Sequence, residues 1–212
     1  AGIIQSYPRD GGTSWYDLTG NGTATLVNTP RFEQTPDCFD CSSGQLEYFT
    51  CGNILNYTSE NFTFSYWIKF NSFRTNDAAQ GPVTIFKGQY NTNGYYAQTT
   101  NSGVEVSSTG ISFITCQSGA VQGSVAEPIY KDVWHNICHV RNGASVKTYI
   151  DGIEKTTYAA THINPTTSSA NFQIGRYASG NIYMNAKIAI FMNYNRDLSA
   201  SEVKQNYDVT KA

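Results

Sequence analysis

Charged residues are scarce in this sequence, and their scarcity limits the partners that the chain can attract. Lys, Arg, Asp and Glu together make up 14% of the 212 residues, and the formal net charge is −2. This balance offers no basic surface that would capture nucleic acid or an anionic membrane. Long hydrophobic runs are absent as well, since no stretch approaches the ~18 apolar residues of a membrane span. We therefore expect neither nucleic-acid binding nor membrane insertion.

The cysteines do not form an even set that would pair fully into disulfides. There are five of them: Cys38, Cys41, Cys51, Cys116 and Cys138. An odd count favours reduced and mostly buried thiols. Cys38 and Cys41 match half of a four-cysteine zinc site, but no second C-x-x-C pair follows. We expect small core residues or a local disulfide here, rather than zinc.

Aromatic residues and turn formers are abundant: 15 Tyr, 11 Phe and 18 Gly. Within residues 62–70, apolar and polar side chains alternate, which indicates a strand with one buried face. Asn93-Gly94 is typical of a tight hairpin turn. Roughly ten to twelve short strands with turn residues between them are typical of a sandwich. We predict an all-β fold, a two-sheet antiparallel β-sandwich or jelly roll, as a single domain over residues 1–212.

One helix is predicted, at the C-terminal end of the chain. Ser199 and Glu202 form an S-x-x-E capping box, in which each side chain binds a free backbone N–H at the helix start. Leu198, Val203 and Tyr207 then supply an apolar stripe at helical spacing. A short helix that covers one end of the sandwich follows from this pattern.

Several motifs resemble the laminin-G-like jelly-roll domains of the concanavalin A-like lectin/glucanase superfamily. The segment "YNRDLSASEVKQNYDVTK" (194–211) is similar to the closing motif of these domains, and "WYDLTGNGT" (15–23) to their opening motif. Landmarks between them, such as "FTFSYWIKF", "VWHNICHVRNG" and "FQIGRY", match in order, so the resemblance spans essentially the whole chain. The opening and closing segments look most like versions in structural proteins of tailed bacteriophages.

The family pattern usually begins with an apolar strand just before the position of Ala1. The chain starts without that strand and without Met, so we expect an excised or processed domain whose first strand is supplied upstream or by another chain. An uncovered sheet edge would favour pairing with a neighbouring subunit.

Glucanases of this architecture carry an E-x-D-x-x-E strand motif, in which carboxylates two residues apart share one face. None of the 16 Asp and Glu residues here is two residues from another. His135 and His139 share a strand face but lie ~13 Å apart along it, too far to bind one metal ion, and His162 has no evident partner. We therefore predict a non-enzyme, although carboxylates from separate strands leave a glycoside hydrolase open as an alternative.

Sugar sites pair aromatic rings with polar hydrogen-bonding groups. Such residues occur here in expected loops, at strand ends and on the polar face of residues 62–70. The candidate carbohydrate-binding residues are Trp67, Tyr95, Tyr96, Arg176, Tyr177 and Tyr183. Half-buried tyrosines that cover sheet faces are the ordinary alternative for each of them.

Calcium is a further candidate ligand. The segment "DLTGNG" provides the Asp17 carboxylate, the Asn21 amide and turned backbone carbonyls, the oxygen types that this cation binds. The same residues also make a good turn without any ion.

Together these features predict a non-catalytic carbohydrate-binding or structural domain of a virion protein, such as a phage fibre, tail or capsid decoration. Its expected partners are a host-surface glycan, other virion subunits or a second copy of itself. Its expected location is the virion or the extracellular space. A purely architectural module without a ligand stays open as an alternative.

Overall fold

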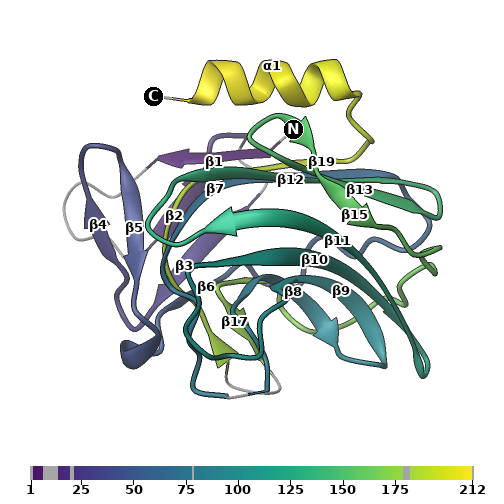
Figure 1. Ribbon diagram of the computed structural model, residues 1–212, viewed down its shortest axis with the longest axis horizontal. Coiled ribbons are helices and arrows are strands. Elements are labelled where there is room, and N and C mark those ends of the chain that lie inside the picture. Colours follow the sequence, from purple (N-terminus) through teal and green to yellow (C-terminus); the bar gives the residue numbers. More distant parts are fainter. Residues whose placement is uncertain (1, 7–13, 20–21, 78, 179–181, 212) are drawn as a thin grey trace.

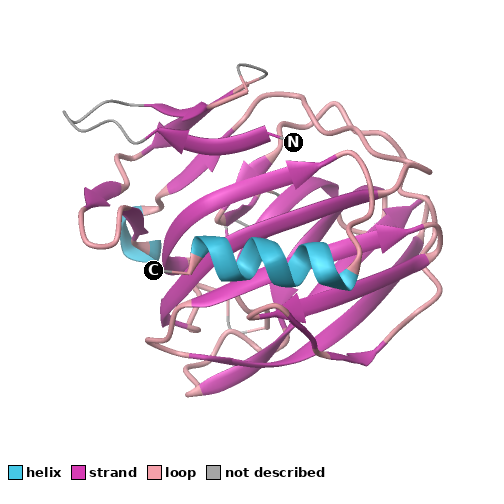
Figure 2. Cartoon of the chain, turned by 90° about the horizontal axis from the view of Figure 1, so that it is seen from above, coloured by secondary structure: helices cyan, strands magenta, loops and turns pink. Residues whose placement is uncertain are grey.

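The computed structural model describes residues 2–6, 14–19, 22–77, 79–178 and 182–211. Two antiparallel sheets pack face to face, and one helix lies across the outside of the first (Figures 1 and 2). The first sheet contains, in order of pairing, β4 (Arg31–Glu33), β5 (Cys38–Cys41), β19 (Asn185–Tyr194), β7 (Phe62–Ser72), β12 (His135–Asn142), β13 (Ser145–Ile150) and β14 (Ile153–Glu154). The prediction of an all-β sandwich with one C-terminal helix is confirmed.

The second sheet carries the surface that is described in the next subsection. Its strands, in order of pairing, are β3 (Thr23–Val27), β6 (Tyr48–Thr50), β16 (Gln173–Ile174), β8 (Val83–Gln89), β9 (Asn93–Thr99), β10 (Ser108–Gln117), β11 (Ala120–Tyr130) and β15 (Thr156–Tyr158). A short 3₁₀ helix, η1 (Ser43–Gln45), precedes β6.

The N-terminal strands join the two sheets. Strand β1 (Gly2–Ser6) pairs with β19 and with β2 (Ser14–Asp17), and β2 pairs in turn with β3. Residues 2–6 therefore already form a strand at the N-terminal edge. The idea that an upstream segment or another chain adds a further strand stays a prediction.

The core between the sheets is aromatic, and β7 is its central contributor. The predicted apolar face of this strand is buried, with the side chains of Phe62, Phe64, Tyr66, Ile68 and Phe70 in the core. Rings from the opposite sheet meet them, for example Tyr95 at 5.5 Å from Phe62 between ring centroids. Burial of these rings is the main stabilising contribution, because the hydrophobic effect grows with the apolar area removed from water.

A chain of hydrogen bonds crosses this aromatic core. The Tyr66 hydroxyl lies 2.8 Å from Thr84 Oγ1 on the opposite sheet and 3.1 Å from His139 Nε2. The other ring nitrogen of His139 is 2.9 Å from Thr148 Oγ1. Each of the four hydrogen-bonded side chains thus has a partner, which removes most of the free-energy cost of burying a polar group.

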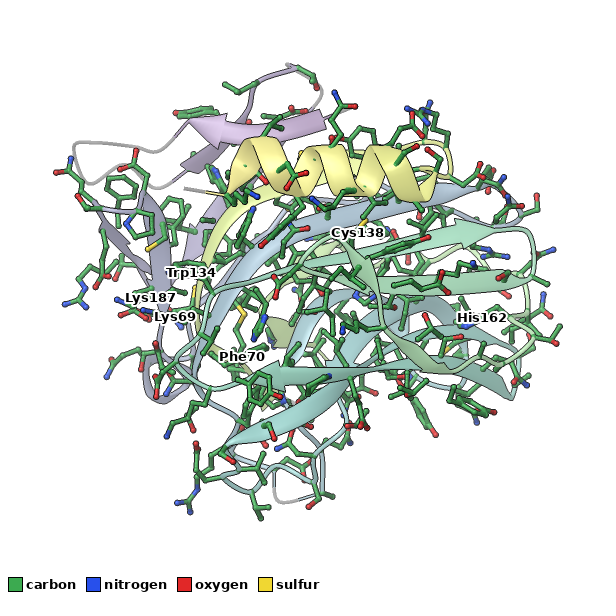
Figure 3. All side chains as sticks on the ribbon, turned by 45° about the horizontal axis from the view of Figure 1, so that its top comes forward. Lys69, Phe70, Trp134, Cys138, His162 and Lys187 are labelled. Carbon is green, nitrogen blue, oxygen red and sulfur yellow. The ribbon has the colours of Figure 1, made fainter. Side chains whose placement is uncertain are left out.

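The C-terminal helix α1 (Ala200–Thr210) forms as the capping box predicted. The Ser199 hydroxyl accepts from the Glu202 amide at 3.3 Å, and a Glu202 carboxylate oxygen accepts from the Ser199 amide at 2.8 Å. Leu198 and Val203 are buried against Cys138 of β12, which lies under the helix (Figure 3). The helix therefore covers the outer face of the first sheet rather than an end of the sandwich.

All five cysteines are free and buried, as expected for small core residues. Cys38 and Cys41 are three residues apart on β5, and such positions point to opposite faces of a strand. Burial raises the pKa of the Cys51 and Cys138 thiols to about 12.

The Asn93-Gly94 turn prediction is wrong. The hairpin between β8 and β9 turns at Tyr90–Thr92, where Asn91 takes the positive φ of 59°. Asn93 and Gly94 lie inside β9, and Gly94 is opposite Gly88. The predicted positive φ is nevertheless present at Gly94, at +75°, and a Cβ there would also stand 1.9 Å from the Lys87 carbonyl oxygen, so both the backbone conformation and the close backbone contact require this glycine.

None of the helices in the described part of the chain has the length and hydropathy needed to cross a bilayer.

The pKa values of two buried histidines lead to a prediction of how the stability of the fold depends on pH. Burial lowers the pKa of His139 to about 3. Burial and the nearby Arg141 charge lower the pKa of His162 to about 4. His162 lies in the connection between β15 and β16, with its ring nitrogens 3.0 Å from Thr115 Oγ1 and 2.8 Å from Ser124 Oγ. The ordinary histidine value is 6.5, so below that pH the unfolded chain takes up protons that the folded chain does not.

We therefore expect the free energy of unfolding to fall between pH 7 and pH 5, by about 2 kcal/mol for each histidine. Urea unfolding at several pH values measures this. His162→Gln should remove roughly half of the decrease, because glutamine does not titrate. An unchanged slope in that variant would contradict the assignment.

Candidate functional site

A small hairpin leaves the second sheet and builds the candidate site. Strand β17 (Arg176–Tyr177) pairs with β18 (Ile182–Tyr183) just after β16. Gly175 makes the departure possible, since its φ is +87° and a Cβ there would stand 2.8 Å from the Met184 methyl group. Its amide donates to the Thr84 carbonyl at 2.8 Å, and its carbonyl accepts from the Met184 amide at 2.9 Å. The base of the hairpin is thus anchored to β8.

One side of this hairpin brings an arginine against two tyrosine rings. The Arg176 guanidinium carbon lies 4.8 Å from the ring centroid of Tyr48 on β6 and 5.4 Å from that of Tyr183. Its Nη1 also donates to the Tyr48 hydroxyl at 3.0 Å. Tyr48 and Arg176 are half-buried, whereas Tyr183 is buried. This cation–π arrangement holds a charge and a phenol next to each other at the surface.

The other side of the hairpin packs on the outer face of the second sheet. The Tyr177 ring lies 4.7 Å from Phe86 and 6.0 Å from Tyr96, measured between centroids. These residues belong to a small apolar cluster that also includes Ile182. Burial raises the pKa of the Tyr96 hydroxyl, as do the nearby Cys116 and Tyr177.

The turn between β8 and β9 adds an exposed ring to this surface. Tyr90 is 51% exposed, and its ring centroid lies 6.5 Å from that of Tyr96. The turn is held by the neighbouring β10–β11 turn, because the Ser118 amide donates to the Thr92 carbonyl at 2.9 Å. We use the name hairpin face for the residues on both sides of the hairpin: Tyr48, Arg176 and Tyr183 on one side, and Tyr177, Tyr96 and Tyr90 on the other.

Four of the six predicted carbohydrate-binding residues meet on the hairpin face: Tyr96, Arg176, Tyr177 and Tyr183. Of these, Arg176 is half-buried, and the three tyrosines are buried against the hairpin and the sheet. Their rings support the surface from below, and the more accessible groups are Arg176, Tyr48 and Tyr90.

The structure corrects the placement of the other two predicted residues. Tyr95 was expected in an exposed loop but lies inside β9, fully buried, where its hydroxyl donates to the Leu55 carbonyl at 2.8 Å. Neighbouring residues of a strand face opposite sides, so Tyr95 points into the core while Tyr96 points out. Trp67 was expected to lie exposed but is covered by α1: its indole donates to Thr210 Oγ1 at 2.9 Å and its ring stacks 5.7 Å from Tyr207.

Two residues of the hairpin face were missed in the sequence. Tyr48 precedes Phe49, which is fully buried, so strand alternation was a signal that Tyr48 faces outward. Tyr90 stands at the tip of a hairpin, and the misplaced Asn93-Gly94 turn hid this position.

Glu47 is a buried carboxylic acid whose pKa is raised by burial and by the nearby Asp40 charge. A raised carboxyl pKa is the property that a general acid of a hydrolase needs. However, Glu47 Oε2 accepts from the Ser42 amide at 2.5 Å, which closes the turn around η1. This contact gives Glu47 a structural role.

Asp17, one of the predicted calcium ligands, lies at the end of β2. Its Oδ1 accepts from the Thr19 amide and from the Thr19 hydroxyl, each at 2.8 Å. This is the pattern of a turn stabilised by its own side chains. Asn21, the second predicted ligand, lies outside the described residues. Within those residues, no group of three or more His, Cys, Asp or Glu stands ready to hold a metal ion.

Comparison with known proteins identifies the fold family. A family model described as the concanavalin A-like lectin/glucanases superfamily matches residues 43–204. A search of curated protein sequences gave no match. The resemblance to tailed-phage structural proteins stays a prediction.

Solved structures of botulinum neurotoxin binding domains have a similar fold. That of type DC, in complex with rat synaptotagmin II, has a TM-score of 0.71 and 14% identity, covering 99% of this chain and 51% of its own. That of type D, in complex with N-acetylneuraminic acid, has a TM-score of 0.69 and 13% identity, covering 98% and 50%. This chain therefore spans about half the length of these domains, and the likeness at this identity concerns the fold alone.

The calcium prediction is tested by thermal unfolding. If Asp17 contributes to an ion site, added calcium raises the unfolding midpoint of the wild type and a chelator reverses the effect, because the ion binds the folded chain. Asp17→Asn should abolish the response, since it removes the carboxylate charge. Equal midpoints with calcium and with chelator would contradict the prediction.

Proposed function

Because the chain belongs to the concanavalin A-like lectin/glucanase superfamily, we propose that it is a non-catalytic domain that binds a glycan through the hairpin face. The observation that carries this proposal is the packing of the Arg176 guanidinium over the rings of Tyr48 and Tyr183. On the other side of the hairpin, Tyr90 adds an exposed ring beside Tyr96.

The chemistry of this surface suits a sugar. The C–H faces of a pyranose pack on aromatic rings, and its hydroxyl groups exchange hydrogen bonds with phenol and guanidinium groups. The Tyr48 hydroxyl and Arg176 lie 3.0 Å apart, so both polar groups reach the same part of a ligand. Because Gly175 and the cluster below Tyr177 anchor β17 and β18 to the sheet, the backbone that carries Arg176 and Tyr183 is fixed before a ligand binds.

The similar structures support a role in recognition. One of them is in complex with a protein receptor, synaptotagmin II, and another with N-acetylneuraminic acid. A third belongs to botulinum neurotoxin type C, whose cell entry depends on interaction with two ganglioside molecules. We propose the same general role for this chain, as part of a larger attachment protein that acts outside the cell or on a virion. Self-association or docking on other subunits of that protein belongs to the same proposal.

A glycan array tests the proposal, with wild type and variants at equal concentration. Tyr90→Ala and Arg176→Gln should each reduce binding to the selected glycan at least about tenfold, since each removes one of the accessible groups of the hairpin face. Tyr90 is exposed, so its replacement leaves the fold intact.

Tyr130→Ala is the matched control. Tyr130 is 46% exposed but lies at the far end of β11 from the turn that contacts the Tyr90 segment. Its binding should equal that of wild type. A purely architectural module would instead bind no glycan, and a hydrolase would release reducing sugar from a polysaccharide; either result would overturn the proposal.

A further inference from the structure

A hollow of about 600 Å³ lies between two loops, apart from the hairpin face. The first loop follows β7 and the second connects β9 with β10. The hollow is lined by Arg74, Thr75, Asn76, Gly103, Val104 and Glu105. Its volume falls in the range of sites that bind small molecules.

Hydrogen bonds between the two loops and within the second loop fix the shape of the hollow. The Thr75 amide donates to the Gly103 carbonyl at 3.1 Å. The Asn101 side-chain amide donates to the Phe73 carbonyl at 2.9 Å and to the Val104 carbonyl at 3.0 Å. Gly103 has a φ of +74°, and a Cβ there would stand 2.0 Å from the Asp77 carbonyl oxygen. The walls are therefore preformed.

The negative charge in the lining is already compensated. Glu105 accepts a hydrogen bond from the Ser72 hydroxyl, and its Oε1 lies 3.1 Å from Lys131 Nζ. Burial by itself would raise the pKa of Glu105, but the Ser72 hydrogen bond and the Lys131 ammonium bring it below its ordinary value. Glu105 is thus an ionised carboxylate with its own counter-ion.

Arg74 supplies a positive charge without such a partner. Its guanidinium makes no ion pair or hydrogen bond with any residue that the structure describes, although its backbone amide binds Ser72. Arg31, another exposed arginine, is by contrast paired with Glu33 and Asp40. The hollow is therefore electrostatically suited to an anion, and a guanidinium binds a carboxylate through two parallel hydrogen bonds.

The apolar wall narrows the class of anion. Val104 lines the hollow and is 50% exposed, so it offers an apolar contact beside the charge. A bare inorganic anion would leave that contact and most of the volume unused. A single guanidinium matches one negative charge. These properties fit a small molecule that carries one carboxylate and an apolar substituent; that this molecule is a sugar rests on the glycan-binding role proposed above.

We propose that this hollow is a second binding site, for a carboxylate-bearing sugar held by Arg74 and packed against Val104. The site lies on other elements than the hairpin face and does not depend on it.

Titration calorimetry with 3′-sialyllactose and lactose at low salt tests the proposal. The charged trisaccharide should bind at least about tenfold more tightly than lactose, and Arg74→Gln should abolish that preference. Arg31→Gln, the matched control, should bind like wild type. Val104→Asp adds a negative charge at an exposed position, so it should weaken sialyllactose binding at least about tenfold without loss of fold.

Other outcomes would overturn the second site. Equal affinity for lactose and sialyllactose would mean that Arg74 does not bind the carboxylate. Competition by inorganic phosphate at the same concentration as sialyllactose would indicate a general anion site. If Tyr90→Ala, but not Arg74→Gln, abolished sialyllactose binding, the ligand would belong to the hairpin face. Failure of the hairpin-face proposal alone would leave the effect of Arg74→Gln unchanged.

Discussion

Alternation of side chains between the two faces of each strand is the constraint on which this structure depends. In β7 it sends five apolar side chains into the core, and in β9 it sends Tyr95 inward and Tyr96 outward. Each sheet therefore also has an outward face, whose side chains either contact solvent or are covered by another element. On the first sheet the helix α1 covers it, and on the second sheet the β17–β18 hairpin covers part of it (Figure 1). The proposed hairpin face is formed by the second of these covers and the strands next to it.

Both proposed binding surfaces share one design, in which short segments are locked to a rigid sandwich by backbone contacts. Gly175 anchors the hairpin to β8, and Gly103 brings two loops into contact around the hollow. In each case a positive φ at glycine allows the close approach. The fold supplies the platform, and function resides in the side chains that these segments present. Each surface contains an arginine: Arg176 of the hairpin face packs against tyrosine rings, and Arg74 of the hollow is exposed to solvent.

The three histidines are all held in hydrogen bonds within the fold. His139 belongs to a hydrogen-bonded chain that spans both sheets, and His162 bonds to Thr115 and Ser124. His135 lies 2.8 Å from Asp151, but its second ring nitrogen accepts from the Tyr130 amide, so it has no free site for substrate. Figure 3 shows His162 in a different part of the molecule from Cys138, the β12 residue under the helix. These groups hold loops and sheets together where apolar packing alone would leave polar atoms unsatisfied.

The sequence by itself determined the features that depend on neighbouring residues. The alternation in residues 62–70 predicted the buried face of β7, and the Ser199–Glu202 box predicted the start of α1, because both patterns are local. Only the tertiary structure decided which distant residues cover or meet an outward-facing side chain. Trp67 is covered by Thr210, 143 residues later, and Arg176 meets Tyr48 across 128 residues. Such contacts follow from strand register and loop packing, which no local pattern encodes.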